Sequence, residues 1–126
     1  MPQFGAVSLR NLKGVDQRLV SICMEAIEIF DFQVVDGLRT EEEQRMNLAA
    51  GKSWTLHSKH LIGKAVDLAP WPIHWADTEM FCVLAGVMRA VAFRYGVKLR
   101  WGGDWNRNNS TTDEKSRDYG HFEIDE

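Results

Sequence analysis

Two histidines and two aspartates have the types and spacing that suit metal chemistry. His60 and Asp67 lie seven positions apart in the segment SKHLIGKAVDL, residues 58–68. His121 lies late in the sequence, three positions after Asp118. Imidazole nitrogens and carboxylate oxygens are common zinc ligands, and three protein ligands with an open fourth position are typical of catalytic zinc sites. The pattern therefore predicts metal-assisted hydrolysis with Zn²⁺ as the cofactor.

Two carboxylates near these ligands could take part in such a reaction. A carboxylate beside a metal-bound water can accept its proton and pass it on, so Asp118 is a candidate general base. Glu123 shares one face of an extended segment with His121. It could act as the base, or it could accept the spare N–H of a histidine ligand and orient that ring. Residue types and spacing alone leave both assignments open.

Arg39 and Ser58 are candidate substrate-binding residues. Arg39 stands just past the end of a predicted strand, where its guanidinium could hold a substrate carboxylate or stabilise a tetrahedral oxyanion. The alternative for Arg39 is a surface ion pair with the acidic residues 41–43. Ser58 could hydrogen-bond the substrate or orient the loop that carries His60, although serines in loops often do no more than cap a turn.

Two motifs together resemble a known family. The pattern SxHxxGxAxD over residues 58–67, followed by DxxH over residues 118–121, resembles the zinc peptidases that cut D-amino-acid-containing bonds of bacterial cell walls. That family includes D-alanyl-D-alanine dipeptidases and carboxypeptidases, and the L-alanyl-D-glutamate peptidases that phages use as endolysins. The resemblance implies three zinc ligands, a general base, and an arginine that acts on the substrate or transition state: His60, Asp67 and His121, then Asp118, then Arg39.

Within that family, the chain is most similar to a phage-type endolysin, because it is a small single domain without a wall-binding repeat. The expected substrate is the peptidoglycan stem peptide, cut at its L-alanyl-D-glutamate bond to lyse the host cell wall. One alternative is a D-alanyl-D-alanine carboxypeptidase or dipeptidase whose pocket closes around a free carboxylate. The other is a zinc-binding module without hydrolytic activity. We expect the protein to accumulate in the host cytoplasm without a signal peptide and to reach the wall through a separate pore.

Composition excludes several other classes of protein. The net charge is −3 and the 15 lysines and arginines are scattered, so the chain lacks the basic face that nucleic acid binding requires. The first residues have no basic segment followed by a long apolar run, so we expect no signal segment. No apolar run reaches the roughly 18 to 20 residues of a membrane span. The 126 residues fit one domain, residues 1–126, which we expect to be a monomer.

Hydrophobic periodicity predicts an α+β fold, with a small and mainly antiparallel sheet that carries the zinc site and helices packed on its other face. In the strand around Asp67, small neighbours at Ala65 and Ala69 share its face and leave room for a metal. Lys52–Leu56 is predicted to be a loop. The expected helices are Val15–Ile29, Thr40–Gly51 and Thr78–Tyr95, and the expected strands are Phe32–Leu38, Ala65–Ala69, Val97–Trp101 and His121–Ile124.

Residues 78–95 are apolar nearly all round, which predicts a helix buried across the sheet. Cys23 and Cys82 both fall within apolar helical patterns, so we expect reduced cysteines in the core, with a buried redox pair as the alternative. The five tryptophans flank the ligand segments, and some of them could wall a groove for a peptide or glycan. They are Trp54, Trp71, Trp75, Trp101 and Trp105.

A polar loop between the last two predicted strands has some features of a calcium site. Asp104, Asn106 and Asn108 place oxygen side chains at alternate positions. The loop departs from the EF-hand pattern, because its sixth residue is Asn109 rather than glycine and its twelfth is Lys115 rather than glutamate. A polar surface loop is therefore the preferred interpretation, with a Ca²⁺ site as the alternative.

Overall fold

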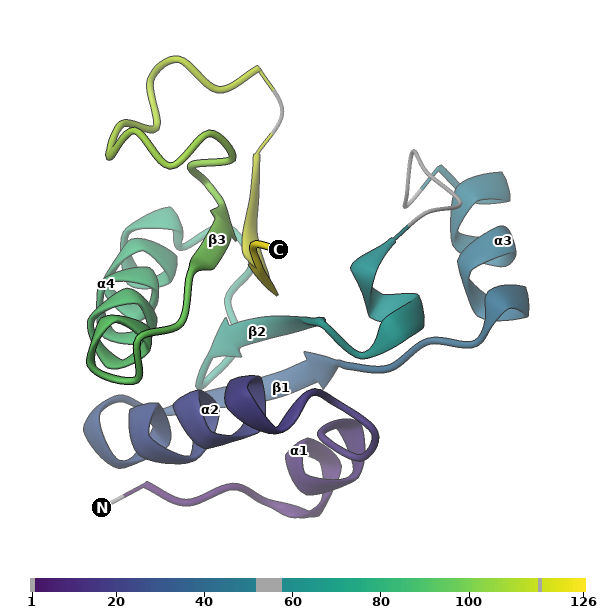
Figure 1. Ribbon diagram of the computed structural model, residues 1–126, viewed down its shortest axis with the longest axis horizontal. Helices are drawn as coiled ribbons and strands as arrows, with labels where there is room; N and C mark the ends of the chain where they lie inside the picture. The colour runs from purple at the N-terminus through teal and green to yellow at the C-terminus, as the bar shows by residue number, and fades with distance from the viewer. Residues whose placement is uncertain (1, 52–57, 116) are drawn as a thin grey trace.

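A four-stranded antiparallel sheet lies at the centre of the protein (Figure 1). The structure, a computed structural model, describes residues 2–51, 58–115 and 117–126. The strands lie in the order β1-β2-β4-β3, so β2 and β4 are the inner strands. Their bounds are β1 Phe32–Asp36, β2 Ala65–Pro70, β3 Leu99–Gly102 and β4 Asp118–Ile124.

The longer helices begin where the sequence supplies a capping side chain. Thr40 and Glu43 form both hydrogen bonds of a capping box at the start of α3. The carboxylates of Asp16 and Asp77 accept backbone N–H groups at the starts of α2 and α4. The helices are α1 Ala6–Asn11, α2 Gln17–Ile29, α3 Glu41–Ala49 and α4 Thr78–Arg94, with a short 3₁₀ helix, η1 Lys59–Ile62.

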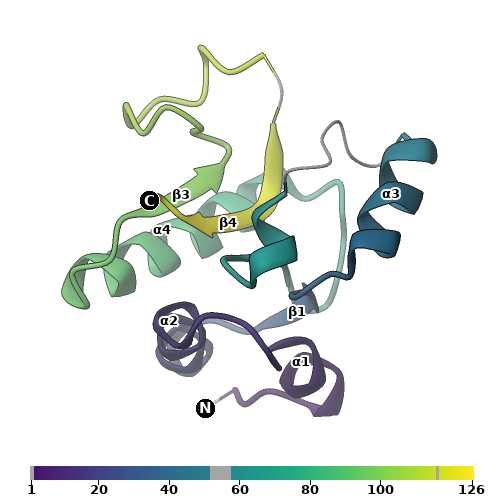
Figure 2. The ribbon, with the colours of Figure 1, turned by 45° about the vertical axis from the view of Figure 1, so that its right-hand side comes forward.

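Helices α2 and α4 pack against each other and against one face of the sheet (Figures 1 and 2). Val66 and Leu68 of β2 are fully buried in this core, and each contributes about 1.5–3 kcal/mol through removal of its side chain from water. Asp67 lies between them in sequence and therefore points to the other face. The predicted α+β arrangement, with a mainly antiparallel sheet and helices packed on one face, is confirmed, and Asp67 lies on the other face.

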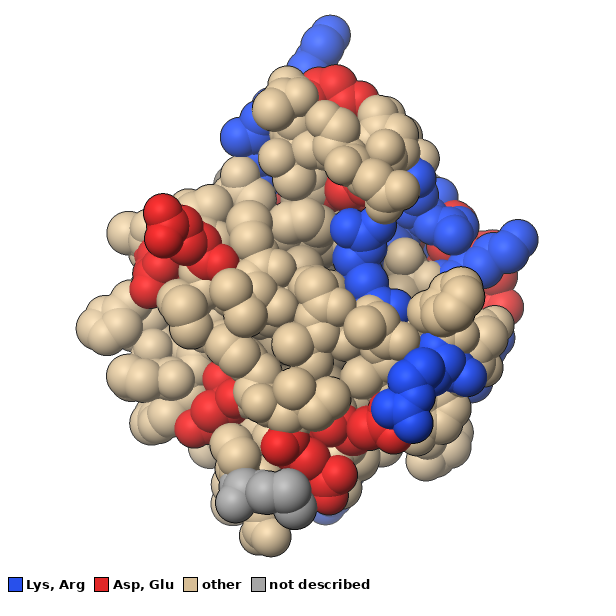
Figure 3. Space-filling model, turned by 90° about the vertical axis from the view of Figure 1, so that its left-hand side faces the viewer, with Lys and Arg blue, Asp and Glu red and all other residues tan. Residues whose placement is uncertain are grey.

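Helix α4 packs across the sheet as predicted, but only one side of its apolar surface is buried. Phe93 is 86% exposed and Val83 is 49% exposed, and both lie on the outward side of the helix. Figure 3 looks at the molecule from the side where α4 lies and shows a broad area without charged side chains. A domain of this size has one core, and α4 at its edge buries only the stripe that meets the sheet and α2.

The two cysteines differ in burial. Cys23 of α2 is fully buried, and the desolvation of its thiol raises its pKa to about 12. Cys82 of α4 is exposed, so the expectation that it belongs to the core is wrong. Its position on the outward side of α4 follows from the same one-sided packing. Both cysteines are free thiols.

Helix α1, which hydrophobic periodicity did not predict, closes the edge of β1. The Ser8 hydroxyl accepts a hydrogen bond from the Val34 backbone N–H at 2.9 Å. The Asn11 side-chain amide donates to the backbone oxygens of Val34 and Val35 at 2.9 and 3.1 Å. These bonds satisfy backbone groups that would otherwise be open to pairing with another strand.

Several element ends differ from the predicted ones. Strand β1 ends at Asp36 instead of Leu38, and β4 begins at Asp118 instead of His121. Strand β3 is shifted two residues toward the C-terminus at its start, and β2 extends to Pro70. The predicted loop Lys52–Leu56 lies outside the described residues. Among the helices that the structure describes, none has the length and apolar character needed to cross a membrane.

Candidate metal centre

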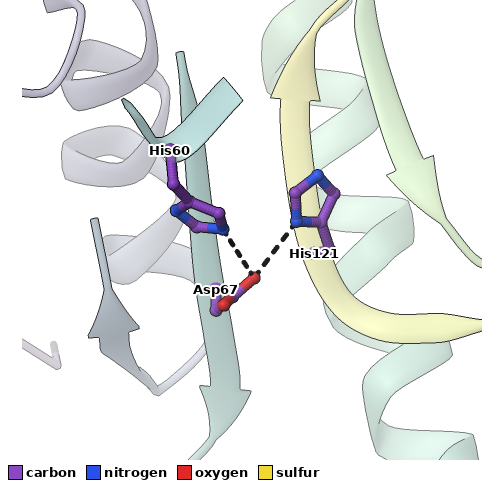
Figure 4. A group of neighbouring side chains, drawn as sticks. All are labelled: His60, Asp67 and His121. Carbon is purple, nitrogen blue, oxygen red and sulfur yellow. Dashed lines mark hydrogen bonds and ion pairs between the residues drawn. The ribbon is translucent and has the colours of Figure 1, made fainter. Parts of the chain in front are cut away.

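Three side chains from three elements meet on the face of the sheet opposite the core (Figure 4). The Asp67 Oδ1 atom lies 3.2 Å from His60 Nε2 and 3.2 Å from His121 Nδ1. One ligand atom from each residue lies within 4.8 Å of the others. Within the described ranges, these residues form the one group of three or more His, Cys, Asp or Glu that could hold a metal ion. The structure thus brings together the three ligands that the sequence predicts.

A backbone carbonyl selects one tautomer of the neutral His60 ring. Its Nδ1 lies 2.7 Å from the Gly37 carbonyl oxygen, which can only accept a hydrogen bond. In the neutral ring Nδ1 therefore carries the proton, which leaves Nε2 free to bind a metal. The Ser58 hydroxyl accepts the His60 backbone N–H and caps η1, and Gly63 ends η1 in the left-handed conformation. Ser58 therefore caps a turn, which was the alternative to a role in substrate binding.

The His121 ring is oriented by Glu123. His121 Nε2 lies 2.8 Å from Glu123 Oε1, so Nε2 donates to the carboxylate and Nδ1 faces Asp67. Lys59 Nζ and Arg100 Nη1 lie 3.3 and 3.5 Å from the other oxygen, Oε2. Burial alone would raise the pKa of Glu123, but the hydrogen bond from His121 and the charge of Lys59 lower it. This geometry favours the orienting role of Glu123 over the role of general base.

Arg39 contacts a ligand of the candidate centre. Its Nη2 lies 3.1 Å from Asp67 Oδ2, which leaves Oδ1 facing the two histidines. Its Nε donates to Asp36 at 2.6 Å and its Nη1 to the Gln44 side chain at 2.8 Å. The alternative of a surface ion pair with residues 41–43 is therefore wrong. Within the part of the chain that the structure describes, three of the five guanidinium donors have protein partners. The predicted role of Arg39 toward substrate stays a prediction.

Asp118 lies at the start of β4, close enough to the centre for Asp67, His121 and His60 to act on its charge. Desolvation by the surrounding protein and the nearby Asp67 carboxylate raise its pKa, although Asp118 is an exposed residue. An ideal strand would turn residues three positions apart to opposite faces. Here the register between β3 and β4 is irregular. Trp101 pairs with Phe122, but the next residue, Gly102, pairs with Asp118, four positions away along β4. Such irregularities change the direction of side chains.

A sequence model of the family described as phage L-alanyl-D-glutamate peptidase matches residues 1–124. The L-alanyl-D-glutamate peptidase of Escherichia phage T5 is 35% identical over 133 aligned positions, which cover 97% of this chain and 97% of that protein. The chain belongs to the phage L-alanyl-D-glutamate peptidase family. The resemblance drawn from the two sequence motifs is thereby confirmed.

Two solved structures resemble this member of the peptidase family. The L-Ala D-Glu endopeptidase ChiX of Serratia marcescens is 33% identical, with a TM-score of 0.81 over 97% of this chain and 89% of that one. A mutant of the vancomycin resistance D,D-pentapeptidase VanY, solved in complex with Zn(II), is 17% identical. Its TM-score is 0.57, over 87% of this chain and 72% of that one, which shows a shared fold.

Trp54 lies outside the described residues, and the other four tryptophans of this family member lie in distinct environments. Trp101 is a core residue, 5% exposed, and its Nε1 donates to the Tyr119 carbonyl at 2.8 Å. Trp105 is half-buried, and its ring centre lies 5.3 Å from that of His121, which places it beside the candidate centre. Trp71 and Trp75 are exposed. The sequence did not single out Trp105, because its contact with His121 depends on the path of the loop after β3.

The calcium alternative finds no support in the loop after β3. The Asp104 carboxylate accepts the backbone N–H groups of Asn108 and Asn109 at 3.2 and 2.8 Å. The side-chain amides of Asn106 and Asn108 donate to Asp113. Oxygens that the EF-hand pattern would offer to an ion thus hold the loop together, as expected of a polar surface loop.

In the metal-free protein, we expect the His121 imidazole to titrate far above the ordinary histidine range. Burial alone would lower its pKa, but the hydrogen bonds with Asp67 and Glu123 outweigh this effect and raise the pKa of His121 to about 9. Because a metal binds only the unprotonated nitrogen, zinc affinity should rise about tenfold per pH unit from about pH 7 to 9. NMR titration of the ring and zinc titrations at several pH values check this. An affinity that stays flat over this range would contradict it.

Proposed function

We propose that the protein is a zinc-dependent peptidase that hydrolyses the L-alanyl-D-glutamate bond of peptidoglycan stem peptides. The observation that carries the proposal is the convergence of His60 Nε2, Asp67 Oδ1 and His121 Nδ1 within 4.8 Å. Family membership supports the choice of bond, because the relatives from phage T5 and Serratia marcescens are named for it.

The donor set fits zinc. Two imidazole nitrogens and one carboxylate oxygen leave a fourth position open, as in catalytic zinc sites. Both rings donate their other N–H, His60 to a backbone carbonyl and His121 to the Glu123 carboxylate. Histidines that bind metals almost always have such partners, which fix the ring and raise its basicity. In this proposal His60, Asp67 and His121 are the zinc ligands, and Glu123 is a positioning residue.

The metal site and Asp118 have different roles in the proposed hydrolysis. A zinc ion bound there would polarise the scissile carbonyl and lower the pKa of a bound water from 15.7 toward about 7. The Asp118 carboxylate accepts the proton of the attacking water and passes it to the departing amine of D-glutamate. Its raised pKa suits this transfer, because a carboxylate with a higher pKa is a stronger base.

Arg39 holds Asp67 in place through Oδ2, and among the described residues two of its guanidinium N–H donors have no protein partner. In the proposed reaction these donors would bind a carboxylate of the stem peptide or the developing oxyanion. Ser58 could add a contact to substrate, although its hydroxyl oxygen already caps η1. The proposed place of action is the bacterial cell wall, which a phage-type endolysin would reach through a separate pore.

Mass spectrometry of the products from purified murein tests the proposed function. We expect fragments with new N-terminal D-glutamate, together with fragments that end in a free L-alanine carboxyl group. A zinc chelator should abolish both, and added Zn²⁺ should restore them, because the reaction needs the metal-bound water. Release of D-alanine alone would instead indicate a D-alanyl-D-alanine carboxypeptidase. No product with zinc bound would indicate a binding module.

A further inference from the structure

An exposed tryptophan borders a hollow away from the metal centre. Trp71 directly follows β2, is 54% exposed, and lines a cavity of about 310 Å³. Asp31 and Gln33, at the start of β1, line the same cavity and are half-buried. The remaining wall comes from Phe32 of β1, from Gln3, and from residues 5–8 at the start of α1. The cavity is therefore built from the N-terminal segment, the edge strand and the end of β2.

The position of this cavity relates it to the metal centre. The Trp71 backbone N–H donates to the Asp31 carbonyl at 3.1 Å, which continues the pairing of β2 with β1. Alternation along the two strands places Trp71, Asp31 and Gln33 on the face that carries Asp67. Four residues of strand at about 3.3 Å each separate Trp71 from Asp67 by about 13 Å.

The chemistry of the cavity suits a sugar. The flat ring of Trp71 offers an apolar surface on which the C–H groups of a pyranose can stack. Within the described residues, the side chains of Asp31 and Gln33 have no hydrogen-bond partner, so their oxygens and amide can pair with hydroxyl and acetamido groups. A few polar groups beside an apolar wall are typical of sites that fix the orientation of a small molecule.

The proposed substrate carries a sugar between its scissile bond and the distance of Trp71. In peptidoglycan, the L-alanine amino group is joined through a lactyl group to an N-acetylated amino sugar. The scissile carbonyl and the sugar are thus separated by about two residue lengths, or about 7 Å. The ring and its neighbour in the glycan strand extend beyond that point, toward the distance of Trp71.

We propose that the cavity beside Trp71 is a subsite for the glycan strand, and that it binds an N-acetylated amino sugar next to the stem peptide being cut. This inference rests on the proposed function, because it takes peptidoglycan as the substrate. Binding energy from a part of the substrate that does not react can raise kcat/KM. The subsite thus makes glycan-linked stem peptides better substrates than free ones.

Two measurements test the subsite. The first is binding of the peptide-free disaccharide of N-acetylglucosamine and N-acetylmuramic acid, followed by NMR. The second is kcat/KM on glycan-linked and on free stem peptide. Trp71→Ala is expected to abolish disaccharide binding and to lower kcat/KM on the glycan-linked peptide about tenfold. On the free peptide it should leave kcat/KM unchanged.

Trp75→Ala is the matched control. Trp75 is 63% exposed and stacks on Phe81, with ring centres 5.9 Å apart, outside the cavity. The Trp75→Ala variant should bind the disaccharide like the wild type, and Trp71→Phe should retain part of the binding. If the wild type does not bind the disaccharide, or Trp71→Ala cuts both peptides like the wild type, the subsite is wrong. If no variant cuts any peptide but only Trp71→Ala loses the disaccharide, the proposed function fails and the subsite stands.

Discussion

Replacing Asp118 with asparagine is expected to lower kcat about 10²- to 10⁴-fold, while the zinc content stays unchanged. Asparagine has nearly the same shape but cannot accept a proton from the attacking water. The Asp118 carboxyl is no predicted ligand, so the centre formed by His60, Asp67 and His121 should remain intact. The measurement is kcat on a stem peptide, together with zinc content by atomic absorption.

The pH profile adds a second readout for Asp118. Its pKa is raised, so the wild-type activity should fall on the acid side at a higher pH than an ordinary aspartate would give. The asparagine variant should lack this step. Asp113→Asn serves as the matched control, because Asp113 binds Asn106 and Asn108 in the surface loop. Full activity of Asp118→Asn would remove it as the base and leave Glu123 as the candidate.

Replacing His60 with glutamine is expected to abolish stoichiometric zinc binding and all measurable hydrolysis. The His60 ring is buried, and its Nε2 is one of three proposed ligands. Losing an outer hydrogen bond of a ligand typically costs about 10- to 100-fold in metal affinity, and losing the ligand itself should cost more. Zinc titration with a competing chelator, read beside circular dichroism, measures the loss in a folded protein.

The control for this variant is His74→Gln, because His74 is exposed and is not part of the candidate centre. It should bind one zinc ion per chain and cut the stem peptide like the wild type. If His60→Gln retained one zinc ion with unchanged affinity, the ligand assignment would be wrong. A zinc-free His60→Gln protein that still cut peptide would contradict the zinc-dependent mechanism.

Local signals in the sequence were sufficient for much of the fold. The starts of α2, α3 and α4 each follow a side chain that caps the first turn, and such caps depend on neighbours within three residues. Helix α1 has only six residues, too few to establish a helical period, and its anchoring by Ser8 and Asn11 to β1 involves residues more than twenty positions away.

In the candidate site, too, features set by neighbouring residues could be predicted, and features set by residues far apart in the sequence could not. The short spacing of His60 and Asp67 could be recognised in one stretch, and the second motif supplied His121. The contact of Arg39 with Asp67 could not be predicted, since Asp67 lies 28 positions away and the contact depends on how β1 meets β2. The placement of Asp118 depends on the register break opposite Gly102, which no local pattern signals.

The bond between His60 and the Gly37 carbonyl ties the chemistry of the centre to a helix that carries none of its ligands. A side-chain carbon at Gly37 would lie 1.9 Å from the Asn11 backbone oxygen, at the end of α1. Helix α1 and the turn after β1 are therefore in direct backbone contact, and that turn decides which nitrogen of His60 is free. A shortened protein that began at α2 would keep all three proposed ligands, yet it would lose the contact that supports His60 in the tautomer suited to metal binding.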